Sequence, residues 1–206
     1  MKHLKMLGLF AMAAAALMAF AGSASAQTLT APTGTTYTGA LSSSLEGSAL
    51  LKAGFAEITC TSGTVAGNVT TNNNTEASGS ITSVSFSNCK EGQTVDTLNN
   101  SGTLTITHKT VEGKTTYPVT GTGTEVTTAV AGVSCVYGLG ATSTALGNAT
   151  NTEVETKVEE KTVKEDWVTL AINAKLPKIS GGFLCASPAS WTANYVVTSP
   201  ADSHLD

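Results

Sequence analysis

Short runs in which apolar and polar residues alternate recur along most of the chain, and this pattern restricts the fold more than any other feature. The clearest run is VTLAINAKL, where Val168, Leu170, Ile172, Ala174 and Leu176 fall on one face of an extended strand. A period of two is typical of a strand that buries one face. The pattern therefore predicts an all-β protein.

Composition supports this prediction. Threonine, serine, glycine and valine dominate after residue 26, and the β-branched residues among them favour strands over helices. No stretch has the pattern of an amphipathic helix of ordinary length. We expect an antiparallel β-sandwich of immunoglobulin-like type, stapled by two disulfides. The expected strands cover residues 35–41, 47–51, 55–61, 64–71, 80–87, 103–108, 117–120, 125–130, 133–137, 141–146, 168–176 and 191–197.

The N-terminal segment has the organisation of a secretory signal peptide. Lysines precede an apolar run over residues 6–21, and the small residues 24–26 form a cleavage site. The apolar run is short and rich in alanine, and no cationic stop follows it, which argues against a membrane anchor. We expect residues 1–26 to be removed. Residues 27–206 would then form a single β-sandwich domain, secreted and with no membrane span.

The charge composition of the chain argues against one class of function, nucleic-acid binding. The chain contains no arginine, and two of its 11 lysines lie in the leader, so nine lysines stand against 15 acidic residues in the rest, a formal net charge of −6. Arginine supplies the forked donors that bind phosphates and base edges. The composition predicts that the protein does not bind nucleic acid and suits a soluble extracellular protein.

Cys60 and Cys89 are placed symmetrically about an Asn-rich turn at residues 72–74. If the chain folds back there, the two cysteines become cross-strand neighbours within disulfide range. Cys60 has the opposite parity to Val65, so a bulge near Ser62–Gly63 is needed to bring both to one face.

The other two cysteines, Cys135 and Cys185, share their parity with neighbouring apolar residues. Four cysteines allow three pairings; we favour Cys60–Cys89 and Cys135–Cys185, each worth roughly 3–4 kcal/mol. The spacing contains no CxxC, and His108 and His204 are isolated in the sequence, so no metal site is expected.

Catalytic machinery is not expected either. No strained nucleophile motif singles out one serine as the partner of His108, and the glycine-rich stretches lack the strand-to-helix setting of a phosphate loop. A charged surface run does not supply the buried acid that a glycosidase needs. The sequence predicts a protein that is not an enzyme and has no cofactor.

One segment, NTEVETKVEEKTVKEDW at residues 151–167, concentrates charge in one place, with six acidic residues and three lysines. Helical i,i+4 pairs are possible, but its valines and threonines favour a strand. It is either a solvated edge hairpin, which we favour, or a recognition surface for a cationic partner. The residues of this charged patch are Glu153, Glu155, Lys157, Glu159, Glu160, Lys161 and Lys164.

The order SGSITSVSFSNC, GVSCVYG and CASPASWTANYVVTSP resembles a group of secreted actinobacterial proteins that have four cysteines and a Thr/Gly/Ser-rich body. Cys60, Cys89, Cys135, Cys185 and the segment Tyr195–Pro200 carry the resemblance, which spans most of the chain after the leader. The charged insert at 151–166 departs from the pattern of that group. The resemblance implies an extracellular β-sandwich and no particular activity.

Three functions remain. The first is a non-catalytic binding or structural module, extracellular or at the cell surface, with an unidentified extracellular or cell-wall partner. The second is a secreted binder of small molecules or polysaccharides, with Trp167 and Trp191 as candidate stacking residues. The third is a pilus-like subunit joined by strand addition, which the polar N-terminal arm QTLTAPTGTTYTGAL disfavours. A secreted hydrolase ranks below these three.

Overall fold

The computed structural model describes residues 28–31, 34–99, 101–158 and 161–206, and every regular element in these ranges is a strand. The expected signal peptide lies outside the described residues. The strands are β1 (Leu29–Thr30), β2 (Gly39–Ala53), β3 (Ala56–Asn72), β4 (Glu76–Cys89), β5 (Gln93–Asn99), β6 (Thr103–Thr107), β7 (Lys109–Val111), β8 (Lys114–Thr122), β9 (Glu125–Val130), β10 (Val133–Gly138), β11 (Thr144–Val158), β12 (Lys161–Leu176), β13 (Lys178–Gly181), β14 (Ala189–Ser199) and β15 (His204–Leu205). The all-β prediction is confirmed.

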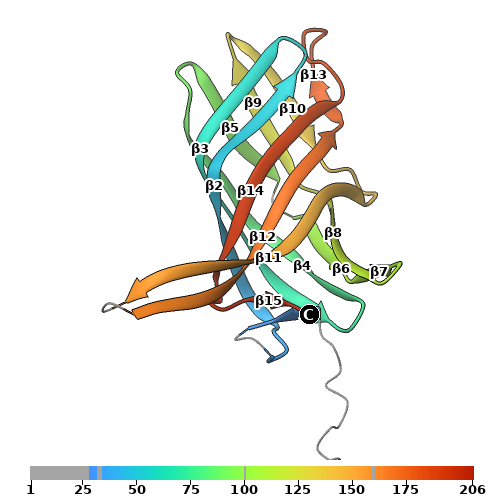
Figure 1. Cartoon of the computed structure of the whole chain (residues 1–206). Coiled ribbons are helices and arrows are strands. Elements are labelled where there is room, and N and C mark those ends of the chain that lie inside the picture. Colours follow the sequence, from blue (N-terminus) through green and yellow to red (C-terminus); the bar gives the residue numbers. More distant parts are fainter. Residues whose placement is uncertain (1–27, 32–33, 100, 159–160) are drawn as a thin grey trace, which may run out of the picture.

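The largest sheet closes on itself. Its strands follow the order β11-β12-β14-β2-β3-β4-β6-β8, β11 also pairs with β8, and β7 continues outward from β8 (Figure 1). The ring of eight strands closes at an irregularity between Ala145 and Gly147. Gly147 has φ +152°, and a Cβ there would lie 1.9 Å from the carbonyl oxygen of Ala171. Only glycine allows β11 to approach β12 this closely at the point where β11 also pairs with β8.

A second sheet, in the order β13-β10-β9-β5, faces the upper part of the large sheet (Figure 1). Apolar side chains from both sheets, among them Leu51, Ile58 and Tyr137, are buried in one cluster. Two facing layers are thus present in the upper half, whereas the lower half is a closed barrel. An immunoglobulin-like sandwich is not confirmed, because the β8–β11 pairing joins what would be the edges of separate sheets.

The hairpin of β3 and β4 pairs Cys60 directly with Cys89, and their Cα atoms are 3.8 Å apart in the disulfide. The expected bulge near Ser62–Gly63 is wrong, because the β3–β4 register continues unbroken past this point. Shifts in the β3–β4 register occur farther along, at Ala66/Gly67 and Val69/Thr71, and the β2–β3 pairing is irregular between Ser44 and Ala49. The second expected disulfide, Cys135–Cys185, also forms and joins β10 to the loop before β14.

The lower end of the barrel is covered by the two-stranded sheet of β1 and β15. Two asparagine side chains hold these strands by acting as both donor and acceptor. Asn72 binds the backbone N–H and C=O of Leu29, and Asn151 binds those of Leu205. Leu29 and Leu205 are both buried. The two terminal segments are thereby fixed to the barrel.

The charged segment is a hairpin of strands, as expected, and not a helix. β11 and β12 pair without a break from Gly147–Ile172 to Val158–Lys161, and their far ends project from the barrel as an arm (Figure 1). In the part of the chain that the structure describes, no helix has the length and apolar character needed to span a membrane.

Candidate functional site

The strongest candidate site is a cavity of about 80 Å³ in the centre of the molecule, between the barrel wall and the second sheet. Strands β2, β3, β4, β6, β11, β12 and β14 line it from the large sheet, and β5, β9 and β10 line it from the other. Alternation along each strand places every second side chain in this interior. Barrels of about eight strands leave an interior that side chains just fill or that holds one small ligand.

The lining is almost wholly apolar and contains no charged side chain. Leu, Ile and Val residues make up most of it, and three aromatic rings meet along one side. The Trp191 ring lies edge-on to Phe86 at 6.5 Å between centroids and to Tyr195 at 6.3 Å. Trp191 is partly buried against the core. A charged ligand would lose its hydration here without gaining a partner.

Two residues of this lining carry a buried hydroxyl group that has no hydrogen-bond partner among the described residues. Tyr195 is 1% exposed, and neither its hydroxyl nor that of Thr124 is bonded to any described group. Burial raises the pKa of the Tyr195 hydroxyl above its ordinary value, because the charged form would lose its hydration. An unpaired buried hydroxyl costs about 1–3 kcal/mol, so a group that bonds to it is favoured.

Tyr137 provides a useful contrast within the same cavity. It lines the cavity and is also 1% exposed, but its hydroxyl donates to the carbonyl oxygen of Ala186 at 3.0 Å. Tyr195 and Tyr137 therefore differ chiefly in whether the hydroxyl is satisfied within the protein. The orphaned Tyr195 hydroxyl is not a general consequence of burying a tyrosine in this fold.

The expected charged patch lies on the projecting arm, at a distance from this cavity along β11 and β12. Glu153 and Glu155 are exposed, and the backbone register sets Glu155 opposite Lys164 and Glu153 opposite Asp166. Glu159 and Glu160 lie outside the described residues, as do the side chains of Lys157, Lys161 and Lys164. Recognition of a cationic partner by this patch stays a prediction.

His108 and His204 both make contacts that are structural in character. His108 stacks on Tyr117, with 5.7 Å between ring centroids, and its Nδ1 lies 3.1 Å from the carbonyl oxygen of Asn74. His204 is isolated in sequence but not in space, because its ring nitrogens lie 3.5 Å from Asp166 and 3.8 Å from Asp206. Among the described residues, no group of three or more His, Cys, Asp or Glu is arranged to hold a metal ion.

Of the two tryptophans named from the sequence, only Trp191 lines the cavity. Trp167 lies at the base of the arm, where its Nε1–H donates to Glu165 at 3.2 Å. The sequence placed Trp191 and Tyr195 on one strand face, and both point inward. No sequence signal identified Thr124, because it lies in a short turn between β8 and β9 whose partners come from distant strands.

Comparison with known proteins supplies no relative: no protein-family model, no curated protein and no solved structure matches this chain.

Proposed function

We propose that this protein is a non-catalytic extracellular binding protein whose central cavity holds one small, neutral, mainly apolar molecule. The observation that carries the proposal is a cavity with an almost wholly apolar lining; Tyr195 is one of its lining residues, and the buried Tyr195 hydroxyl has no partner among the described residues. A ligand with one hydroxyl, carbonyl or amide group would bond to Tyr195 and bury its remaining atoms against Leu, Ile and Val side chains.

The cavity volume bounds the ligand. A buried water needs about 10–15 Å³ of such space, so the cavity has room for about five to eight water-sized groups. Filling it with water is unfavourable, because each buried water needs two to four polar partners and the lining offers few. A compact alcohol, ketone or amide meets both the volume and the polarity of the site.

The proposal is tested by titrating the protein with a matched series: cyclic alcohols, the corresponding ketones, the corresponding hydrocarbons and the corresponding carboxylates. Binding is followed by tryptophan fluorescence, to which Trp191 and Trp167 both contribute. The variant Trp191→Phe shows how much of the signal comes from Trp167. We expect alcohols and ketones to bind more tightly than hydrocarbons and carboxylates not to bind. Equal affinity for carboxylates would show that the site is elsewhere.

A cavity-filling variant supplies the second test. Ala49 is buried in the lining, and Ala49→Leu places additional methyl groups in the empty space. Val111→Leu serves as a surface control, since it adds one methylene on β7, where the side chain is exposed. We expect Ala49→Leu to lose ligand binding and Val111→Leu to retain it. Circular dichroism checks that both variants are folded. Unchanged binding by a folded Ala49→Leu variant would contradict the proposal.

A second function, a structural or interaction module at the cell surface, is favoured by the projecting arm. A two-stranded ribbon has little stability of its own in water, and a partner that covers it would stabilise it. The two disulfides support an oxidising environment. We propose secretion, with cell-wall association through the charged patch, in line with the actinobacterial resemblance. Salt-sensitive retention on isolated cell-wall material tests this function.

A further inference from the structure

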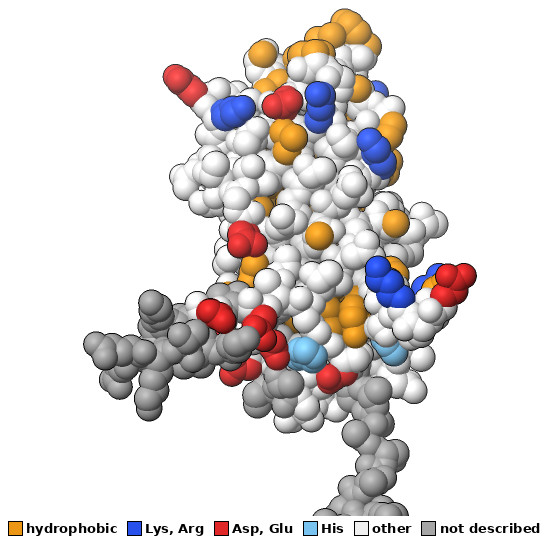
Figure 2. All heavy atoms as spheres, in the orientation of Figure 1, with side chains coloured by type: hydrophobic (Ala, Val, Ile, Leu, Met, Phe, Trp, Pro, Cys, Tyr) orange, Lys and Arg blue, Asp and Glu red, His pale blue; other side chains and the backbone are white. Residues whose placement is uncertain are grey.

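Four exposed hydrophobic side chains gather at the upper end of the molecule, where Figure 2 shows orange side chains at its summit. They are Phe55 in the β2–β3 turn, Ile179 in β13, and Phe183 and Leu184 in the β13–β14 loop, and they form the apolar tip. Their exposed fractions are 64% for Phe55, 44% for Ile179, 93% for Phe183 and 42% for Leu184. Single exposed hydrophobic residues are ordinary, but a group on neighbouring loops marks an interaction surface.

The two loops of the apolar tip are in contact. Phe55 and Leu184 line the same small pocket, of about 10 Å³. A Cβ on Gly54 would lie 3.0 Å from that of Ala186, so the β2–β3 turn lies directly against the β13–β14 loop. The hydrophobic side chains of the tip therefore belong to one surface.

The loop that carries Phe183 is held in place by contacts of the two residues that follow Leu184. Cys185 is joined to Cys135 by a disulfide, and its backbone N–H donates to Gly182 at 3.1 Å. Beyond it, the carbonyl of Ala186 accepts the Tyr137 hydroxyl. Phe183 is thus displayed to solvent by a fixed loop and cannot reach the core. Because this hydrophobic surface is kept in contact with water, it would be stabilised by binding an apolar surface outside the chain.

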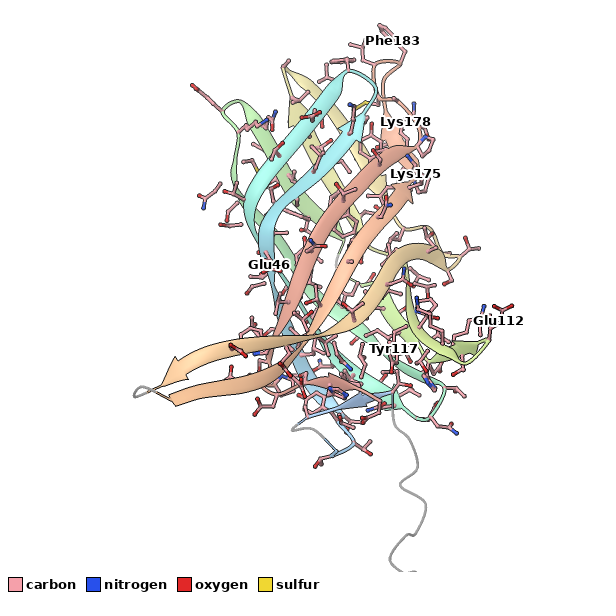
Figure 3. The ribbon with its side chains drawn as sticks, in the orientation of Figure 1. Glu46, Glu112, Tyr117, Lys175, Lys178 and Phe183 are labelled. Carbon is pink, nitrogen blue, oxygen red and sulfur yellow. A yellow bond between two sulfur atoms is a disulfide. The ribbon has the colours of Figure 1, made fainter. Side chains whose placement is uncertain are left out.

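Lysines border the apolar tip, although the chain as a whole is acidic. Lys178 and Lys175 lie below Phe183 on the same side of the molecule (Figure 3). Lys52 also lies at this end, paired with Glu57 at 3.9 Å. Acidic side chains are also present at this end, Glu57 among them, but the largest group of acidic side chains in Figure 2 lies at the opposite end, around the base of the arm. An apolar tip with a cationic border is complementary to an anionic lipid surface.

We propose that the apolar tip docks the protein onto an anionic lipid membrane surface. Phe183 and Phe55 enter the boundary between headgroups and acyl chains, and Lys175 and Lys178 contact the anionic headgroups. The inference goes beyond ligand binding and does not depend on it. The pocket below the tip shares Leu51 and Tyr137 with the central cavity, so docking would place the cavity on the membrane-facing side.

The test is co-sedimentation of the folded protein with vesicles of phosphatidylcholine and phosphatidylglycerol in equal parts, compared with vesicles of phosphatidylcholine alone. We expect binding to the anionic vesicles and weaker binding to the neutral ones. Phe183→Ser should weaken vesicle binding about ten- to a hundredfold, because the variant no longer gains the free energy of transferring a phenyl ring from water into the lipid. Lys175→Ala with Lys178→Ala should weaken it about tenfold or more at low salt and much less at high salt.

Matched control variants come from β7 and its turn into β8, on another part of the surface. Val111 is the exposed hydrophobic residue there, flanked by lysines. Val111→Ser and Lys109→Ala with Lys114→Ala should leave vesicle binding unchanged. If the control variants lost as much vesicle binding as the tip variants, binding would depend on the overall charge and hydrophobicity of the protein and not on the apolar tip. That result would overturn the proposal.

Two further results would overturn it. One is a folded wild type that does not bind the anionic vesicles. The other is a dimer, seen by sedimentation equilibrium without lipid, that Phe183→Ser abolishes; a second copy of the chain would then cover the apolar tip. Ala49→Leu should retain vesicle binding whatever it does to the cavity ligand, which separates this inference from the proposed function. Circular dichroism melting confirms that each variant is folded.

Discussion

Replacing Tyr195 by phenylalanine should stabilise the protein when its cavity holds no ligand. The hydroxyl is buried and has no partner among the described residues, so folding removes it from water and returns no hydrogen bond. Phenylalanine keeps the ring, and with it the edge contact to Trp191. The substitution therefore removes a desolvation penalty while leaving the packing almost unchanged.

The size of the effect follows from the same two contributions. An unpaired buried hydroxyl costs about 1–3 kcal/mol, and losing the dispersion contacts of one oxygen atom returns a few tenths. We expect the free energy of unfolding to rise by about 1–2 kcal/mol. For a protein of this size, each kcal/mol corresponds to about 2–4 °C in Tm. The increase should therefore be measurable by urea and by thermal denaturation.

Tyr137 supplies the matched control. It is equally buried and lines the same cavity, but its hydroxyl is bonded to Ala186. Tyr137→Phe should lower the free energy of unfolding by about 0.5–1.5 kcal/mol. Urea unfolding followed by circular dichroism, with unchanged m-values, compares the two variants directly.

The two substitutions are expected to change the free energy of unfolding in opposite directions, and this difference makes the comparison decisive. The reasoning fails if Tyr195→Phe destabilises the protein as much as Tyr137→Phe, because the Tyr195 hydroxyl would then have a partner in the folded protein, such as a bound water. Binding adds a second comparison. Tyr195→Phe should lower the binding affinity for alcohols and ketones by about fivefold or more, and should leave the affinity for hydrocarbons almost unchanged.

Three other perturbations test the fold and the charged patch. Replacing Cys60 and Cys89 by alanine opens a loop with a sequence separation of 29 and should cost about 3–4 kcal/mol in urea unfolding; a loss below about 1 kcal/mol would contradict the assignment of a stabilising staple. Gly147→Ala should cost about 2 kcal/mol or more, because its Cβ would meet the carbonyl oxygen of Ala171 at 1.9 Å. Gly182→Ala, with open space around it, should be nearly neutral. Equal Tm values would show that the close approach of β11 to β12 does not need the glycine. Changing the four glutamates of the charged patch to glutamine should lower solubility and leave Tm within about 2 °C, since exposed ion pairs contribute about 0–1 kcal/mol; a soluble, equally stable variant that no longer binds cell-wall material would instead favour specific recognition.

Features decided by neighbours in sequence could be predicted from the sequence alone. The β-branched composition and the period of two predicted strands, because both act through local backbone and side-chain preferences. The Cys60–Cys89 pairing followed from symmetry about one turn, and the strand form of the arm followed from its valines and threonines. In each case the residues that form the structure lie within one hairpin.

Features that join distant segments were decided only by the tertiary structure. Closure of the barrel depends on β8 meeting β11 at Gly147, one of 20 glycines, and nothing local distinguishes it from the others. The cavity and the orphaned hydroxyl of Tyr195 arise because eight strands and a second sheet surround a volume that the side chains do not fill. Alternation says that Tyr195 points inward, but whether its hydroxyl meets an acceptor depends on strands far away in sequence. The apolar tip likewise arises because two loops, more than a hundred residues apart, meet at one end of the molecule. Period-two patterning fixes the face of a strand to which a side chain belongs, and long-range packing alone determines what that side chain contacts.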